Sequence, residues 1–138
     1  MAYYNFARTA DDIADNPRLS PKKKIAMLDE LEAVLLDEKK ASKSTHAAKV
    51  LRKSLEITGI TPKHATDLLV AFRMDAKGAI YDSWADLMNY CKYSANPVGR
   101  YMLDLHGEGK EAYWPSDMLC SALQVINHVQ DMQKDWQE

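Results

Sequence analysis

Along almost the whole of this 138-residue chain, the apolar residues recur at the three- and four-residue spacing of an α-helix. From Ile25, for example, they recur at Leu28, Leu31 and Leu35, which places them on one helix face and the charged residues opposite. No stretch of alternating polar and apolar residues predicts a β-strand. We therefore expect an all-α fold, in which about six helices of roughly 15 to 25 residues pack side by side in a single domain spanning residues 1–138.

Start and break signals divide this pattern into separate helices. The pair Ser20-Pro21 suits the cap and first turn of one helix. The segment 83–86 has Ser followed three residues later by Asp, and predicts the start of another helix, which runs towards residue 105. Pro97 and Gly99 should interrupt that helix and kink it. Pro115 is expected to begin the last helix, which continues to the C-terminus.

The composition excludes several functional classes. The chain has 18 Lys and Arg against 20 Asp and Glu, a net charge of −2 that gives no electrostatic basis for binding nucleic acid. Cys91 and Cys120 have neither metal-ligand spacing nor a disulfide framework, so we interpret them as reduced core residues. No apolar run approaches the roughly 18 residues of a transmembrane helix. We expect a cytoplasmic protein, for which peripheral contact with the inner face of the membrane stays open.

A first group of carboxylates lies near the N-terminus. Residues 8–15 read Arg-Thr-Ala-Asp-Asp-Ile-Ala-Asp, so Asp11 and Asp15 lie one helical turn apart, with Arg8 within roughly 60° of Asp11. Carboxylates this close repel one another unless a divalent cation lies between them. Magnesium takes oxygen ligands and keeps several waters, so one or two carboxylates with phosphate oxygens would complete its coordination.

A second group of polar residues lies near the C-terminus. Its four members fall within an arc of roughly 80° on one helix: Gln124, Asn127, Asp131 and Asp135. Such a row is unusual for a helix core and is what a buried polar cavity requires, because each buried polar group must find a partner. Aspartates four residues apart also arise by chance on charged surfaces, so neither group identifies a metal site by itself.

The order and spacing of these motifs resemble those of the squalene/phytoene synthases. The paired signature is Arg-x-x-Asp-Asp-Ile-Ala-Asp at 8–15 and Gln-x-x-Asn-x-x-x-Asp-x-x-x-Asp at 124–135. Between them, residues 90–100 are similar to the family's Tyr-Cys-x-Tyr-x-Ala-Gly-x-Val-Gly segment. The version Ser-Ala-Asn-Pro-Val-Gly-Arg at 94–100 resembles the bacterial hydroxysqualene synthases of hopanoid pathways. The resemblance covers essentially the whole chain, which would correspond to a truncated middle portion of a family member.

This resemblance implies a fold and a set of site residues. The fold would be part of an isoprenoid-synthase-type helical bundle. The cofactor would be Mg²⁺, with Mn²⁺ as the alternative ion, and no NADPH is expected. The implied metal ligands are Asp11, Asp15, Asp131 and Asp135. The implied diphosphate-binding residues are Arg8, Asp12, Gln124 and Asn127. Tyr93 matches the tyrosine that family members place near the reacting carbons, and would be the catalytic residue.

The resemblance also implies an activity on a prenyl diphosphate. The reaction would be conversion of presqualene diphosphate to hydroxysqualene, or head-to-head condensation of farnesyl diphosphate. The alternative is a non-catalytic helical fragment or scaffold that at most binds magnesium and diphosphate. Its open apolar faces would then favour a homo-oligomer. A small metal-storage or electron-transfer bundle is disfavoured, because no Glu-x-x-His pair is present.

Overall fold

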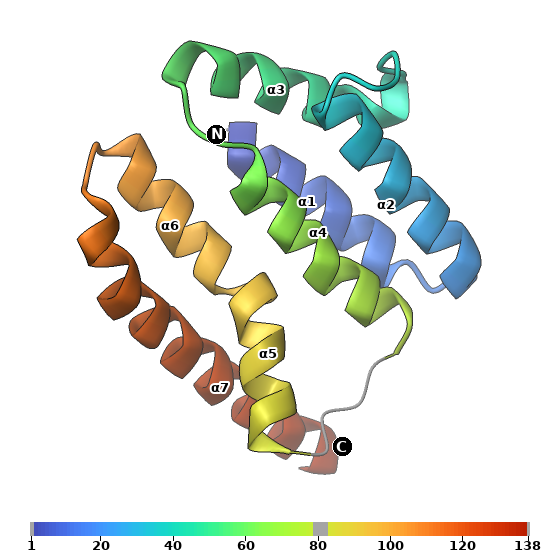
Figure 1. Ribbon diagram of the computed structural model, residues 1–138. Coiled ribbons are helices and arrows are strands. Elements are labelled where there is room, and N and C mark those ends of the chain that lie inside the picture. The colour runs from blue at the N-terminus through green and yellow to red at the C-terminus, as the bar shows by residue number, and fades with distance from the viewer. Residues whose placement is uncertain (1, 79–82, 138) are drawn as a thin grey trace. The chain divides into compact units, whose positions relative to one another are not determined.

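The computed structural model describes the backbone of residues 2–78 and 83–137 and the side chains of residues 2–78 and 83–127. All regular elements in these ranges are helical, which confirms the all-α class (Figure 1). The α-helices are α1 (Ala2–Asp15), α2 (Pro21–Leu35), α3 (His46–Thr58), α4 (Lys63–Ala76), α5 (Trp84–Ser94), α6 (Asn96–Leu105) and α7 (Tyr113–Gln137). Short 3₁₀ turns, η1 (Lys43–Thr45) and η2 (Lys110–Ala112), precede α3 and α7.

The chain divides into two compact units, Met1–Ile80 and Tyr81–Glu138. In the first unit, helix α1 packs against α2, α3 and α4, and α2 packs against α3 and α4. The side chains that fill this core are fully buried, and include Phe6, Leu28, Leu31, Val34, Leu51 and Leu69. Burying one large apolar side chain stabilises a fold by roughly 1.5–3 kcal/mol. The predicted stripe on α2 is therefore a core face. The prediction of a single domain over residues 1–138 stays a prediction.

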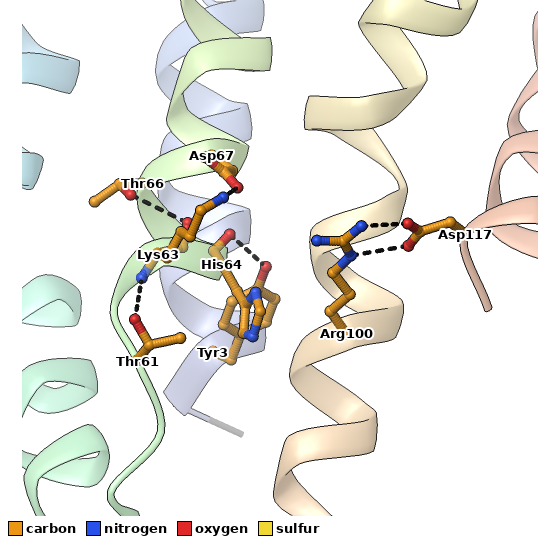
Figure 2. A network of polar contacts seen from close by, with 8 residues as sticks. All are labelled: Tyr3, Thr61, Lys63, His64, Thr66, Asp67, Arg100 and Asp117. Carbon is orange, nitrogen blue, oxygen red and sulfur yellow. Dashed lines mark hydrogen bonds and ion pairs between the residues drawn. The ribbon is translucent and has the colours of Figure 1, made fainter. Parts of the chain in front are cut away.

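Polar contacts add orientation to this apolar core. The buried Tyr3 hydroxyl on α1 donates a hydrogen bond of 3.2 Å to the backbone oxygen of His64 on α4 (Figure 2). The half-buried guanidinium of Arg73 on α4 bridges to α2. Its Nε lies 2.9 Å from Asp29 Oδ1 and its Nη2 lies 2.9 Å from Glu32 Oε2. Helix α4 is thus joined to both α1 and α2 by polar groups as well as by packing.

The predicted helix starts are confirmed at two serines. Ser20 Oγ accepts a hydrogen bond of 3.2 Å from the backbone N–H of Lys23, and Ser83 Oγ accepts one of 3.1 Å from that of Asp86. The last helix begins at Tyr113, two residues before the predicted start at Pro115. The first four N–H groups of a helix have no partner within it, so a proline in this turn removes no hydrogen bond.

The predicted interruption of helix 84–105 is confirmed and lies at Ala95, between α5 and α6. Pro97 stands in the first turn of α6, where its fixed backbone angle favours starting a new helix. The residue before it, Asn96, is buried, and its Oδ1 accepts a hydrogen bond of 3.0 Å from Ser121 Oγ on α7. The break in the helix therefore also attaches α6 to α7.

Gly99 marks the closest approach of α6 to α7. A Cβ atom at this position would lie 2.5 Å from Ser116 Oγ and 2.8 Å from Cys120 Sγ, closer than real Cβ contacts. The next residue, Arg100, forms a two-point ion pair with Asp117 on α7, in which its Nε lies 3.0 Å from Oδ1 (Figure 2). Residues 96–100 therefore dock α6 onto α7.

We predict that Gly99→Ala destabilises the protein by about 1–3 kcal/mol, because the added methyl group has no room between the two helices. Alanine is otherwise favoured over glycine inside a helix by about 1 kcal/mol. Helix propensity alone would therefore stabilise the variant, which is opposite to the loss of stability that we expect. Urea unfolding followed by circular dichroism measures it. Gly109→Ala is the matched control, since only the flexible carboxylate of Glu111 stands near that position. An unchanged midpoint for Gly99→Ala would contradict the close approach.

Candidate functional site

Helix α1 separates an apolar face from an acidic face. Its buried side chains follow the helical spacing and are Tyr3, Phe6, Ala10, Ile13 and Ala14. On the opposite face, Asp12 and Asp15 are exposed, and Asp11 is half-buried at the edge of the apolar stripe. Because the apolar face is anchored in the core, the three carboxylates are held on one short stretch of rigid helix.

The charges on this face are only partly balanced. Arg8 Nε lies 3.5 Å from Asp12 Oδ1, and both side chains are exposed. Burial raises the pKa of the Asp11 carboxyl, and the charge of Asp15, a hydrogen bond to Asp15 and the charge of Asp12 raise it further, while Arg8 lowers it. The arginine next to Asp11 in the predicted motif thus pairs with Asp12, and Asp11 keeps an excess of negative neighbours.

The second polar row lies on α7. Gln124 is half-buried and Asn127 is exposed, and the buried polar cavity predicted for this row stays a prediction. Asp131 and Asp135 lie on the same helix, and their side chains are outside the described residues. At roughly 100° per residue, the four positions share one face of α7.

The polar row lies on the same side of α7 as the residues that contact α6, and it follows them along the helix. The α7 residues that contact α6 are Ser116, Asp117, Cys120 and Ser121. At roughly 100° per residue, these contact residues and the polar row each occupy an arc on the helix, and the centres of the two arcs differ by less than about 20°. Helix α5 meets a neighbouring face of α7, in an apolar hollow lined by Trp84, Met88, Met118, Ser121, Ala122, Val125 and Ile126. Further along this side of α7, Gln124 is half-buried and Asn127 is exposed.

The central segment carries the predicted catalytic tyrosine on α5. Tyr93 is half-buried, and Lys92 Nζ lies 5.6 Å from the centre of its ring. Cys91 is fully buried, its Sγ donates to the backbone oxygen of Ser121 at 4.0 Å, and burial raises the pKa of its thiol. A protonated, enclosed thiol supports the packing role expected for Cys91. Within the described residues, Ser94 Oγ is buried without a hydrogen-bond partner, which typically costs about 1–3 kcal/mol.

Comparison with known proteins decides the family. The sequence model described as squalene/phytoene synthase matches residues 1–138. This chain belongs to that family. Hydroxysqualene synthase from Sinorhizobium fredii (strain NBRC 101917 / NGR234) is 50% identical over 137 residues, covering 99% of this chain and 46% of that protein. Hydroxysqualene synthase from Rhodopseudomonas palustris (strain ATCC BAA-98 / CGA009) is 48% identical over 136 residues, with the same two shares.

A solved structure agrees with the assignment to the squalene/phytoene synthases. The crystal structure of squalene synthase HpnC from Alicyclobacillus acidocaldarius matches with a TM-score of 0.79 and 34% sequence identity. The match covers 98% of this chain and 51% of that chain. The chain thus spans about half the length of the relatives it matches. The predicted family and fold are confirmed.

The carboxylate oxygens on α1 are of the type that the magnesium implied by this family requires. No group of three or more His, Cys, Asp or Glu side chains within residues 2–78 and 83–127 is arranged to hold a metal ion by itself. Magnesium needs only one or two carboxylates when waters and phosphate oxygens supply the remaining ligands. Burial, followed by the negative charges of Asp15 and Asp12, raises the pKa of Asp11, and a divalent cation would relieve the repulsion among these carboxylates. None of the helices in the described part is long and apolar enough to cross a membrane.

Sequence reasoning missed the contacts that position α7. Asn96, Gly99 and Arg100 were matched to the family segment, but their partners on α7 were not predicted. One signal was available: Ser116 and Cys120 are small residues four apart, which lets another helix approach closely. The Asp117 partner of Arg100 carries no such signal, because opposite charges 17 residues apart are common in any chain of this composition.

We predict that Asp11→Asn raises thermal stability at neutral pH by less than about 1 kcal/mol, since the carboxyl group is largely solvated. A raised pKa means that the folded state holds the Asp11 proton more tightly than the unfolded chain, so ionisation at neutral pH costs stability. That cost disappears as the pH falls below the ordinary value of 3.8, and the two proteins should then unfold together. Thermal melts at neutral and acid pH measure this difference. Glu108 is an exposed carboxylate in the loop after α6, and Glu108→Gln controls for the loss of one charge. A lower melting temperature of Asp11→Asn at neutral pH would contradict the prediction.

Proposed function

We propose that this chain carries the magnesium- and diphosphate-binding part of an enzyme that converts presqualene diphosphate to hydroxysqualene. The observation that carries the proposal is the crowding of carboxylates on α1, where burial and like charge raise the pKa of Asp11. Such an arrangement destabilises a fold and is explained by a cation that shares the carboxylates. The named reaction follows the relatives called hydroxysqualene synthase, which are 48–50% identical to this chain.

In this proposal, the two acidic motifs hold the ion and its diphosphate together. The metal ligands are Asp11, Asp15, Asp131 and Asp135, and Mn²⁺ can replace Mg²⁺ because it takes the same oxygen ligands. When bound, the ion neutralises the diphosphate and stabilises it as a leaving group. The anchored face of α1 keeps its carboxylates on a rigid helix, so little ordering is needed when the ion and diphosphate bind.

The remaining polar residues bind the diphosphate itself. Arg8 has a guanidinium suited to two-point contact with phosphate, and its exposed pair with Asp12 holds it on the acidic face. Asp12 therefore acts through the position of Arg8. The side-chain N–H groups of Gln124 and Asn127 donate to diphosphate oxygens from α7. Their partial exposure leaves these donors accessible to an incoming ligand.

Tyr93 is proposed to act on the hydrocarbon side of the reaction. Its half-buried ring provides an apolar surface and its hydroxyl a polar group near the reacting carbons. The buried hydroxyl of the adjacent Ser94 places a second polar group in this segment. Conversion of presqualene diphosphate to hydroxysqualene consumes one water and releases one diphosphate, so it requires no reductant. We therefore propose no role for NADPH.

Two alternatives use the same residues. Head-to-head condensation of farnesyl diphosphate would need the same metal and diphosphate site, with a second prenyl diphosphate in place of water. The second alternative is a non-catalytic unit that binds magnesium and diphosphate alone. Both alternatives predict binding of pyrophosphate, and they differ in turnover.

Calorimetric titration of the chain with magnesium and pyrophosphate tests the proposal. We expect magnesium-dependent binding that weakens at least about tenfold, or 1.4 kcal/mol, in a double variant Asp11→Asn, Asp131→Asn. The double variant Asp86→Asn, Glu108→Gln removes the same charge from exposed positions and should bind like the parent. Incubation with presqualene diphosphate then separates an enzyme, which forms hydroxysqualene, from a binding unit. A parent chain that binds no pyrophosphate in the presence of magnesium would refute the proposed site.

A further inference from the structure

A basic surface lies where α2 turns into α3. Residues 36–53, here named the basic corner, hold six Lys and Arg and two Asp and Glu, a net charge of 6 − 2 = +4. The whole chain has a net charge of −2, so the other residues together carry −2 − 4 = −6. Positive charge is therefore enriched in this stretch, as it also is at Arg18 and at Lys22, Lys23 and Lys24 near the start of α2.

Ion pairs neutralise only part of this charge. Lys39 Nζ lies 2.7 Å from Glu30 Oε1, and Arg52 Nη1 lies 3.0 Å from Asp37 Oδ1. The four other lysines have no ion pair within the part of the chain that the structure describes, and are Lys40, Lys43, Lys49 and Lys53. These lysines are available to an external anion.

The backbone of the basic corner is held in a defined turn. Asp37 has a φ of 62°, the left-handed conformation that closes many helix C-termini. Its N–H donates to the backbone oxygen of Val34, and the N–H of Glu38 donates to that of Ala33 at 2.7 Å. Arg52 Nη1 donates to the same Val34 oxygen at 3.0 Å and so ties the turn to α3. The turn borders a surface hollow of about 480 Å³ that Lys40, Lys49 and Arg52 help to line.

Helix α3 adds apolar side chains to this positive surface. Its inner face is buried through Ala48, Leu51 and Leu55. On the outer face, Val50, Lys53 and Ile57 follow one another at helical spacing, and the side chain of Ile57 is 86% exposed. Leu36, at the end of α2, is 40% exposed. The outer face of α3 therefore combines lysine with exposed aliphatic side chains, the two kinds of side chain with which surface helices contact anionic lipid.

The basic corner is separate from the acidic site. Helix α2 begins soon after Asp15 and ends just before the basic corner, as its course in Figure 1 shows. Its 15 residues span roughly 22 Å at 1.5 Å per residue. A ligand at the basic corner is therefore not the diphosphate proposed for Asp11 and Asp15.

We propose that the basic corner and the outer face of α3 dock on an anionic membrane surface. Lys40, Lys43, Lys49 and Lys53 would lie over the phosphate headgroups, and Ile57 would insert at the boundary of the acyl chains. Charge complementarity supports this occupant, because anionic leaflets attract clustered lysines at about 1 kcal/mol each. The exposed aliphatic side chains favour lipid over nucleic acid, which offers them no apolar phase. This inference goes beyond the proposed function and does not depend on it.

Vesicle flotation with the whole chain tests the docking surface. We expect binding to vesicles of phosphatidylcholine with phosphatidylglycerol, weak binding to phosphatidylcholine alone, and weakening by salt. The triple variant Lys40→Gln, Lys43→Gln, Lys53→Gln should bind up to about a hundredfold more weakly, at about 1 kcal/mol per lysine. The matched control is Lys22→Gln, Lys23→Gln, Lys24→Gln, which removes three charges at the other end of α2 and should lose much less.

Three results would overturn the proposal. Equal losses in the two triple variants would show attraction by net charge without a docking surface. Equal binding to neutral and anionic vesicles would remove the role of the lysines. Displacement by inorganic phosphate, at an ionic strength matched with sodium chloride, would assign the hollow to a small anion.

Ile57→Ser is a second variant, and its binding to anionic vesicles should fall severalfold while its helical circular dichroism stays that of the parent. Unchanged vesicle binding would contradict the insertion of this side chain.

Discussion

The close approach of α6 to α7 at Gly99 is the contact on which the second unit depends. With no side chain at this position, the two helices meet at a distance that any larger residue would prevent. Polar contacts on both sides of the glycine then fix the arrangement: Asn96 accepts from Ser121, and Arg100 pairs with Asp117. Sliding or rotating α7 would break these contacts together. In this unit, the segment that carries the family resemblance therefore docks α6 onto α7, the helix of the second acidic motif.

The same docking explains which part of α7 is accessible. Helix α6 covers one face of α7 near its start, and that face becomes the polar row further along. The chain breaks at Ala95, and α5 then packs on a neighbouring face through apolar side chains such as Trp84 and Met88. Within the described residues, the polar row is half-buried at Gln124 and exposed at Asn127. In the first unit, the buried apolar stripe of α1 anchors this helix in the core, while Asp11 and Asp15 remain on its other side.

The sequence predicted the local features of this fold well and the contacts between helices poorly. Helical spacing identified the class, and Ser20 and Ser83 identified two helix starts, because a cap is decided within four residues. The partner of Arg100 and the exposure of Asn127 depend on how α5 and α6 lie on α7. Spacing alone could not supply them. The ion pair of Arg8 with Asp12 shows the same limit within one helix, since spacing allows several partners and the side-chain conformations decide between them.

The two proposed surfaces of unit 1 lie near opposite ends of α2. The carboxylates of α1 lie near its start, and the basic corner follows its end. An anionic surface attracts the basic corner and repels the carboxylates. Lys22, Lys23 and Lys24 at the start of α2 offset this repulsion. Since the separation is about 22 Å, more than two Debye lengths at physiological salt, membrane contact and cation binding should influence each other only weakly.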